Sequence, residues 1–182
     1  MILLIGIAGS GKGTQGKLLA DRYKYRLITM GDIIRLHLSG EQRERLMSGF
    51  LLDDQAIIKL LDDVLKTISD DNRVVLDGFP RSVTQAKWLM EQSRTGRFSI
   101  DHAFHLVASK EVVKQRLLAR SRPDDHDQAI ELRFNEYEKA TKPIIDWFID
   151  NGVQVLDIDG EKTVKEVHES IASHIQDANQ AS

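Results

Sequence analysis

The chain has 182 residues, of which 41% are hydrophobic and 29% charged, as expected for one folded domain with a sizeable core rather than a disordered segment. Its formal net charge of -3 predicts no overall basic surface for nucleic acid, and no apolar run reaches the ~18 residues needed to cross a bilayer. Because cysteine is absent, disulfides and thiolate zinc sites are excluded, and a cytoplasmic protein is expected.

Short apolar runs alternate with longer helical stretches from one end of the chain to the other. The predicted strands are short and apolar on both faces, as buried parallel strands are. They lie at Met1–Ile5, Tyr25–Thr29, Arg73–Leu76, His102–Val107 and Val153–Ile158. The predicted helices lie at Lys12–Tyr23, Asp53–Ser69, Val83–Gln92, Lys110–Ala119, Asp127–Asp150 and Thr163–Gln176.

This alternation predicts a three-layer α/β fold in which a parallel five-stranded sheet is covered by helices on both faces. No linker or repeat interrupts the pattern, so residues 1–182 are predicted to form a single domain. Sheets of this kind bind ligands beyond the carboxyl ends of their strands. The strand-to-helix junctions are therefore the candidate sites.

The first junction has the features of a phosphate-binding loop. Glycines let several backbone N–H groups turn toward one anion, and the start of the next helix adds partial positive charge. Lys12 adds a full charge. The pattern predicts a P-loop NTPase fold that binds a nucleoside triphosphate, although a glycine-rich turn that binds nothing is the alternative. The residues expected to hold the phosphates are Gly9, Ser10, Gly11, Lys12, Gly13 and Thr14.

Three segments resemble the adenylate kinase family. The first is Gly11–Gln15, where Gly13 follows the lysine and the threonine comes one residue later than in the general motif. The second is Thr29–Arg35, and the third is Leu76–Arg81 followed by Gln85. Read without the family, Arg35 could be a solvated helix residue and the third segment a plain turn.

The resemblance implies a binding site for an acceptor nucleotide. Its residues would be Met30, Arg35, Leu52, Gly78, Arg81 and Gln85. Arginine presents a planar fork of donors to phosphate oxygens, and the glutamine would hydrogen-bond the acceptor base. The same resemblance implies that Asp77, at the end of a buried strand, binds the Mg²⁺ of MgATP through water.

An arginine-rich segment near residue 120 resembles the family's short-lid form. Arg116 and Arg120 are four residues apart and share one helix face. The resemblance implies that Arg116 stacks on the donor adenine, while the backbone near Gly160 touches that base. Together with Lys12, the residues implied to be catalytic are Arg120, Arg122 and Arg133, supported by Asp124 and Asp125. A solvated basic helix end is the alternative for this segment.

The sequence departs from the family pattern in its two predicted mobile parts. Met30 stands where adenylate kinases have threonine and pyrimidine nucleotide kinases have alanine, so the acceptor stays open. Asp53 stands where proline is usual. The nucleotide-binding arm (residues 30–59) and the lid (residues 120–128) both look shorter than in typical relatives.

The function expected from these patterns is reversible phosphoryl transfer from MgATP to a nucleoside monophosphate, with AMP as the first candidate and two ADP as the products. The alternatives are a kinase for CMP, UMP or another small molecule, and a nucleotide-binding regulatory module with weak transfer activity. The expected partners are ATP, a nucleoside monophosphate and Mg²⁺. A monomer that binds neither nucleic acid nor membrane is expected.

Overall fold

A computed structural model describes residues 1–37, 53–68, 73–122 and 125–180, with side chains as far as residue 175. Its strands are β1 (Ile2–Ile5), β2 (Arg26–Thr29), β3 (Val74–Asp77), β4 (His102–Val107) and β5 (Val155–Asp159). Its helices are α1 (Lys12–Tyr23), α2 (Met30–His37), α4 (Asp54–Lys66), α5 (Val83–Arg94), α6 (Lys110–Arg120), α7 (Asp127–Glu136), the π-helical η1 (Tyr137–Thr141), α8 (Lys142–Asp150) and α9 (Val164–Gln180).

The described strands form one parallel sheet in the order β2-β3-β1-β4-β5, which confirms the predicted α/β class. In the central strand, Leu3 pairs with Leu76 of β3 on one side and with Ala103 of β4 on the other. All four residues of β1 are buried. Parallel strands covered on both faces have no side in water, which is why β1 is apolar throughout.

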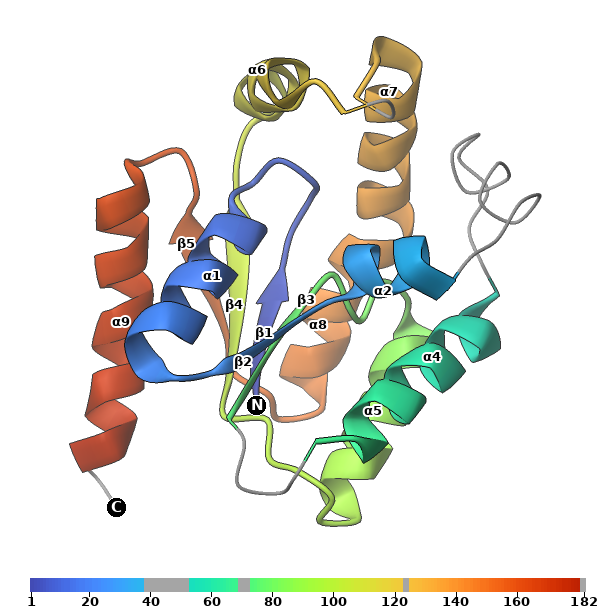
Figure 1. Cartoon of the computed structure of the whole chain (residues 1–182), viewed down its shortest axis with the longest axis vertical. Coiled ribbons are helices and arrows are strands. Elements are labelled where there is room, and N and C mark those ends of the chain that lie inside the picture. The colour runs from blue at the N-terminus through green and yellow to red at the C-terminus, as the bar shows by residue number, and fades with distance from the viewer. Residues whose placement is uncertain (38–52, 69–72, 123–124, 181–182) are drawn as a thin grey trace.

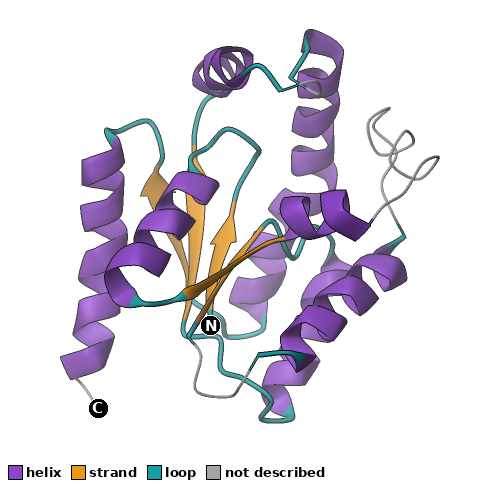
Figure 2. Ribbon diagram, in the orientation of Figure 1, coloured by secondary structure: helices purple, strands orange, loops and turns teal. Residues whose placement is uncertain are grey.

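Two helical layers enclose the sheet, as Figures 1 and 2 show. On one face, Leu19 of α1 and Ile171 of α9 pack in one cluster with Leu4 and Phe104 of the sheet. Helices α2, α4, α5 and α8 cover the other face, where their apolar side chains join those of Leu3, Ile5 and neighbouring strands. Burying each such side chain contributes roughly 1.5–3 kcal/mol relative to leaving it exposed.

The structure differs from the sequence prediction in two helices. The stretch predicted as one helix over Asp127–Asp150 is divided by the π-helical turn η1 into α7 and α8. Pro143, near the start of α8, lacks the N–H that would continue the α-helical ladder, so the hydrogen-bond pattern changes just before it. Helix α2 was not among the predicted helices, and its buried Met30, Ile33 and Ile34 have the spacing of one helix face.

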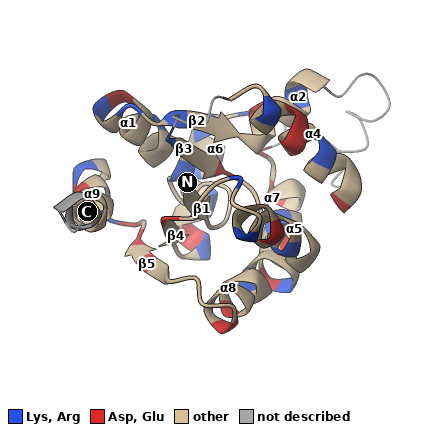
Figure 3. Cartoon of the chain, turned by 90° about the horizontal axis from the view of Figure 1, so that it is seen from below, with Lys and Arg blue, Asp and Glu red and all other residues tan. Residues whose placement is uncertain are grey.

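Within the part of the chain that the structure describes, no helix is long and apolar enough to span a membrane. Lys and Arg residues alternate with Asp and Glu residues along outer helices such as α4 and α5 (Figure 3). Residues of both charges thus share the same helices.

His168 of α9 is buried where α9 packs on α1. Its side chain is 2% exposed, its ring lies 5.9 Å from that of Tyr23, and neither ring nitrogen has a hydrogen-bond partner among the described residues. Burial lowers the pKa of His168, and repulsion from Arg22 lowers it further, while Glu169 raises it by a smaller amount. The folded state therefore favours the neutral ring.

We expect His168 to make the fold less stable in mild acid. Because its folded-state pKa lies below the ordinary 6.5, the unfolded chain takes up the proton first, and stability is lost as the pH falls below about 6.5. Urea unfolding at pH 7.5 and pH 5.5 measures this loss. The wild type should lose more free energy of unfolding over this interval than His168→Leu, and equal losses would contradict the assignment.

Candidate active site

The phosphate loop connects β1 to α1 at the carboxyl end of the sheet. Gly9 and Gly11 have φ angles of 91° and 108°, a region that glycine enters without steric cost. A Cβ on Gly9 would also lie only 3.1 Å from Leu117, so α6 packs directly on the loop. Gly11 then precedes α1, whose free N–H groups face the loop. The sequence folds here into an anion-binding turn.

Lys12 lies across this loop. Its Nζ donates hydrogen bonds to the carbonyl oxygens of Gly6 at 2.7 Å and Ile7 at 2.8 Å. Burial lowers the pKa of Lys12 to about 8, and Arg81 and Arg120 contribute to the lowering, whereas Asp77 opposes it. A bound polyphosphate would supply the negative charge that this ammonium group needs.

Asp77 ends β3 and faces the phosphate loop. Its side chain is buried, and a Cβ on Gly13 would lie 3.5 Å from its Oδ2 atom. Among the described residues, no three acidic or histidine side chains come together to form a metal site. One carboxylate at the mouth of a phosphate loop nevertheless fits Mg²⁺, which takes most of its ligands from phosphate and water. Coordination through water stays a prediction.

The third predicted junction turns sharply after Asp77. Gly78 has a φ of 82°, and Arg81 folds back over it, with its Nε donating to the Gly78 carbonyl oxygen at 2.9 Å. A Cβ on Gly78 would lie 3.0 Å from the Arg81 guanidinium. The backbone N–H of Arg81 donates to Oε1 of Gln85 at 2.8 Å. The arginine and the glutamine of this motif are thus held next to each other, and their roles toward an acceptor stay a prediction.

The second junction places Arg35 in α2, where the guanidinium pairs with Asp32. The Arg35 side chain is 42% exposed and thus accessible to a ligand. Met30, the first residue of α2, is in contrast only 1% exposed, and its side chain packs in the core. Its predicted place beside an acceptor base stays a prediction. Leu52, also predicted to bind the acceptor, lies outside the described residues.

Asp125 holds the arginines of the predicted lid. It accepts two hydrogen bonds from Arg120, at 2.8 and 2.7 Å, and one from Arg133 at 2.9 Å. The backbone N–H of Arg122 donates to the same carboxylate at 3.2 Å. Burial alone would raise the pKa of Asp125, but these hydrogen bonds outweigh it and lower that pKa to about 2. Asp124, the other predicted support residue, lies outside the described residues.

The cations of these separate motifs act on one another. Burial lowers the pKa of Arg81, and repulsion from Arg133 and Arg35 lowers it further, whereas attraction by Asp77 raises it. Lys12 is affected in turn by Arg81 and Arg120. Cations from the phosphate loop, the acceptor junctions and the predicted lid thus influence one another, and a polyanion would offset their repulsion.

The predicted donor-base residues also meet. Nη1 of Arg116 donates to the Gly160 carbonyl oxygen at 2.7 Å. A Cβ on Gly160 would lie 2.7 Å from the Ser10 carbonyl oxygen, so only glycine permits this approach to the phosphate loop. The loop after β5 is thus fixed against both α6 and the phosphate loop.

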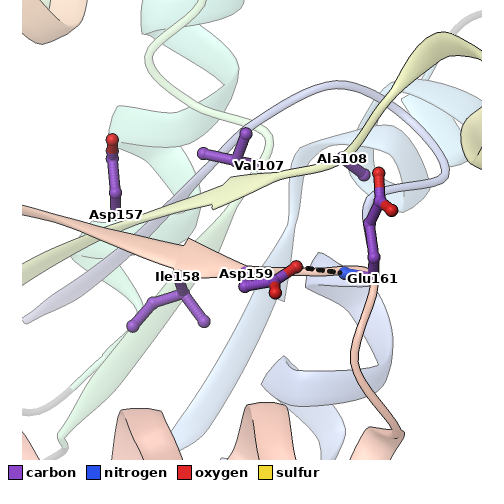
Figure 4. A pocket seen from close by; sticks show the side chains of 6 residues that line it. All are labelled: Val107, Ala108, Asp157, Ile158, Asp159 and Glu161. Atoms are coloured by element: carbon purple, nitrogen blue, oxygen red, sulfur yellow. Dashed lines mark hydrogen bonds between the residues drawn. The ribbon is translucent and has the colours of Figure 1, made fainter.

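A cavity of about 360 Å³ lies beside this loop, at the ends of β4 and β5. Figure 4 shows Glu161 in the turn after β5, where its N–H donates to Asp159 at 3.0 Å. Three of the residues that line the cavity directly precede Gly160 in the segment predicted to touch the donor base, and the other three were not singled out from the sequence. They are Val107, Ala108, Asp157, Ile158, Asp159 and Glu161.

Two side-chain networks near the site were also missed by sequence reasoning. Asp54 of α4 accepts a hydrogen bond from Gln85 Nε2 at 2.7 Å. His105 of β4 lies between Asp157, at 2.7 Å, and the hydroxyl of Tyr137 in η1, at 2.5 Å. These partners are 31 to 52 positions apart, so no local spacing could have linked them.

The comparisons with known proteins agree with this geometry. The family model described as adenylate kinase matches residues 4–153. The chain belongs to the adenylate kinase family. An adenylate kinase from Corynebacterium urealyticum is 33% identical over 175 residues, which cover 93% of this chain and 95% of that protein. Adenylate kinase 1 of a Nostoc species is 35% identical over 173 residues, which cover 91% and 93%. An adenylate kinase from Trichodesmium erythraeum is 32% identical, with 96% of each chain covered.

Membership of the adenylate kinase family makes the chain a nucleoside monophosphate kinase, and thus a transferase that binds nucleotides. The family membership favours a kinase over the alternative of a regulatory module with weak transfer activity. The cationic residues Lys12, Arg81, Arg120 and Arg133 are the candidates for carrying out this activity.

Replacing Asp125 with asparagine is expected to destabilise the fold by about 1–3 kcal/mol, because the partly buried guanidinium groups of Arg120 and Arg133 lose their charged, buried acceptor. The folded-state pKa of about 2 lies below the ordinary 3.8, so this stabilisation is present above about pH 4 and is lost toward pH 2. Chemical denaturation at pH 7 and pH 3 measures it. Asp127→Asn, which breaks an exposed ion pair with Lys114, is the control and should lose much less. Equal losses in the two variants would refute the buried role of Asp125.

We also expect MgATP binding to be coupled to proton uptake by Lys12. Since the pKa of Lys12 is about 8 without ligand and phosphates raise it, binding at pH 8 should take up about half a proton. Calorimetry in two buffers of different ionisation enthalpy measures this number. Near pH 6.5 the ammonium is protonated in both states, so its uptake should vanish. The same uptake at both pH values would contradict the assignment.

Proposed function

We propose that the chain transfers the terminal phosphoryl group of MgATP to AMP, producing two ADP, with the roles of individual residues given below. The observation that supports this most is that Lys12 and Arg81 are both attracted by Asp77 and both repelled by further arginines, Lys12 by Arg120 and Arg81 by Arg133. Two nucleotides that meet through their phosphates supply the negative charge for which this arrangement is built.

On the donor side, Lys12 and the backbone N–H groups from Gly9 to Thr14 bind the phosphates of ATP. Arg116 and the Gly160 backbone hold the adenine end, where the two are already joined at 2.7 Å. Asp77 is the residue that would hold Mg²⁺, and the ion would offset the charge of the donor phosphates. The adenylate kinase family generally uses MgATP, which fits this assignment.

On the acceptor side, Arg35 and Arg81 bind the phosphate of AMP, and Gln85 hydrogen-bonds the base. A phosphate oxygen of AMP attacks the terminal phosphorus of ATP. The new bond joins that oxygen to the phosphorus, and the bond that breaks joins the phosphorus to the bridging oxygen of the departing ADP. Arg120, Arg122 and Arg133 neutralise the equatorial oxygens, so the reaction needs positioning and charge rather than a protein nucleophile.

A different acceptor remains the second candidate, because buried Met30 replaces the residue usual in adenylate kinases. Initial rates with MgATP and equal concentrations of AMP, CMP, UMP, GMP, dAMP and dCMP decide between the candidates. The proposal predicts the highest rate with AMP. A higher rate with another monophosphate would preserve the mechanism and change the substrate, whereas no diphosphate from any of them would refute the proposal.

Lys12→Ala and Arg81→Ala are each expected to lower kcat/KM by at least about a hundredfold, since each removes a charge that stabilises the transferring phosphoryl group. Lys17→Ala on the exposed side of α1 and Arg94→Ala at the end of α5 are the matched controls. A coupled assay for ADP measures the rates, and circular dichroism verifies the fold. Normal turnover in a correctly folded Lys12 or Arg81 variant would refute the role of that residue.

A further inference from the structure

The side-chain amide of Gln85 is held at both ends. Its Oε1 accepts the backbone N–H of Arg81 at 2.8 Å, and its Nε2 donates to Oδ1 of Asp54 at 2.7 Å. Oδ2 of Asp54 accepts from the Ser82 hydroxyl at 2.7 Å, which fixes the carboxylate in turn. Gln85 is 4% exposed, and the hydrogen bonds that hold it are partly buried.

These partners permit only one orientation of the amide. A backbone N–H can only donate, and an ionised carboxylate can only accept. Rotating the Gln85 amide by 180° would bring its NH₂ group against the Arg81 N–H and its oxygen against the Asp54 carboxylate. Both contacts would then be repulsive, and two buried polar groups would lose their partners.

Within the described part of the chain, the fixed amide has one partner at each end, so one N–H and one lone pair of its oxygen stay available, since an amide has two donors and two acceptor sites. Adenine and cytosine present an amino group next to an unprotonated ring nitrogen. The amino group would donate to Oε1, and the ring nitrogen would accept from Nε2. Guanine and uracil present the opposite order, a carbonyl next to a ring N–H, which in the same position would oppose both amide atoms.

We infer that Asp54 is a positioning residue that makes the acceptor site selective for amino bases over keto bases, by fixing the orientation of Gln85. This inference depends on the proposed function, because it takes Gln85 as the residue that contacts the acceptor base. Asp54 does not touch the base itself. Without it, only the Arg81 N–H still orients the Gln85 amide, so rotating the amide to pair with guanine or uracil costs less free energy.

Asp54 also begins α4, where a negative charge stabilises the helix. The adjacent Asp53 caps the same helix by accepting the Ala56 N–H at 3.4 Å, and Gln85 makes its contact with Asp54 rather than with Asp53. Asp53→Ala therefore removes a charge from the same helix start without releasing the amide. It is the matched control for Asp54→Ala.

The test compares kcat/KM for AMP and GMP at saturating MgATP. Asp54→Ala should lower the AMP-to-GMP ratio by about tenfold or more, the size of one hydrogen-bond discrimination. Asp54→Asn should keep the ratio within about threefold, because its oxygen still accepts from Gln85 while its NH₂ donates to Ser82. Asp53→Ala should also preserve the ratio. If Asp54→Ala does not fold, Asp54→Ser replaces it, with the same loss expected.

Two results would overturn the inference while leaving the proposed function intact: an unchanged ratio in a folded Asp54→Ala or Asp54→Ser variant, and an equal loss in Asp53→Ala. A wild type that phosphorylates GMP better than AMP would overturn it as well. A wild type that phosphorylates no nucleoside monophosphate would instead refute the proposed function.

Discussion

The constraint on which the rest of the structure depends is repulsion among cations that face one space. Lys12, Arg81, Arg120 and Arg133 come from four segments of the chain; repulsion from Arg81 and Arg120 lowers the pKa of Lys12, and repulsion from Arg133 lowers that of Arg81. Without a bound anion, each has to be held by the protein. Carbonyl oxygens hold Lys12 and Arg81, and the buried carboxylate of Asp125 holds Arg120 and Arg133. Nucleotide phosphates would take over part of the role of these protein groups. The positive charges that repel one another are therefore the charges proposed to bind substrate.

The sheet makes this arrangement possible. Parallel strands bring their carboxyl ends to one edge, so the loops after β1, β3 and β5 meet there although they are far apart in the sequence. Helix α6 packs on the phosphate loop through Leu117 and reaches the loop after β5 through Arg116. Ion pairs from Lys110 to Glu131 and from Lys114 to Asp127 join α6 to α7, which carries Arg133. Each arginine is therefore positioned by an element that is itself fixed to the sheet.

Most of this fold could be predicted from the sequence, because short apolar runs and glycine junctions are local signals. Helix α1 and strand β4 have the predicted bounds, and the predicted phosphate loop lies between β1 and α1. The π-helical turn at Tyr137 was missed, since it depends on the geometry before Pro143 as well as on periodicity. Asp54 was predicted only as part of the helix over Asp53–Ser69, because its contact with Gln85 exists only after α4 packs beside α5. The burial of Met30 likewise depends on how α2 packs on the core, which the local sequence does not give. Local sequence patterns indicate where the functional residues lie, whereas tertiary packing determines how their side chains are oriented and which of them are buried.

Direct transfer of the phosphoryl group between two bound nucleotides is the central feature of the proposed mechanism. The most direct measurement follows ATP, AMP, ADP and inorganic phosphate together by ³¹P NMR during turnover by the wild-type protein. The account predicts that AMP disappears at the same rate as ATP, that each pair is converted into two ADP, and that ATP is stable when AMP is left out. Release of inorganic phosphate at the same rate with and without AMP would contradict it, because the cations would then be assisting attack by water.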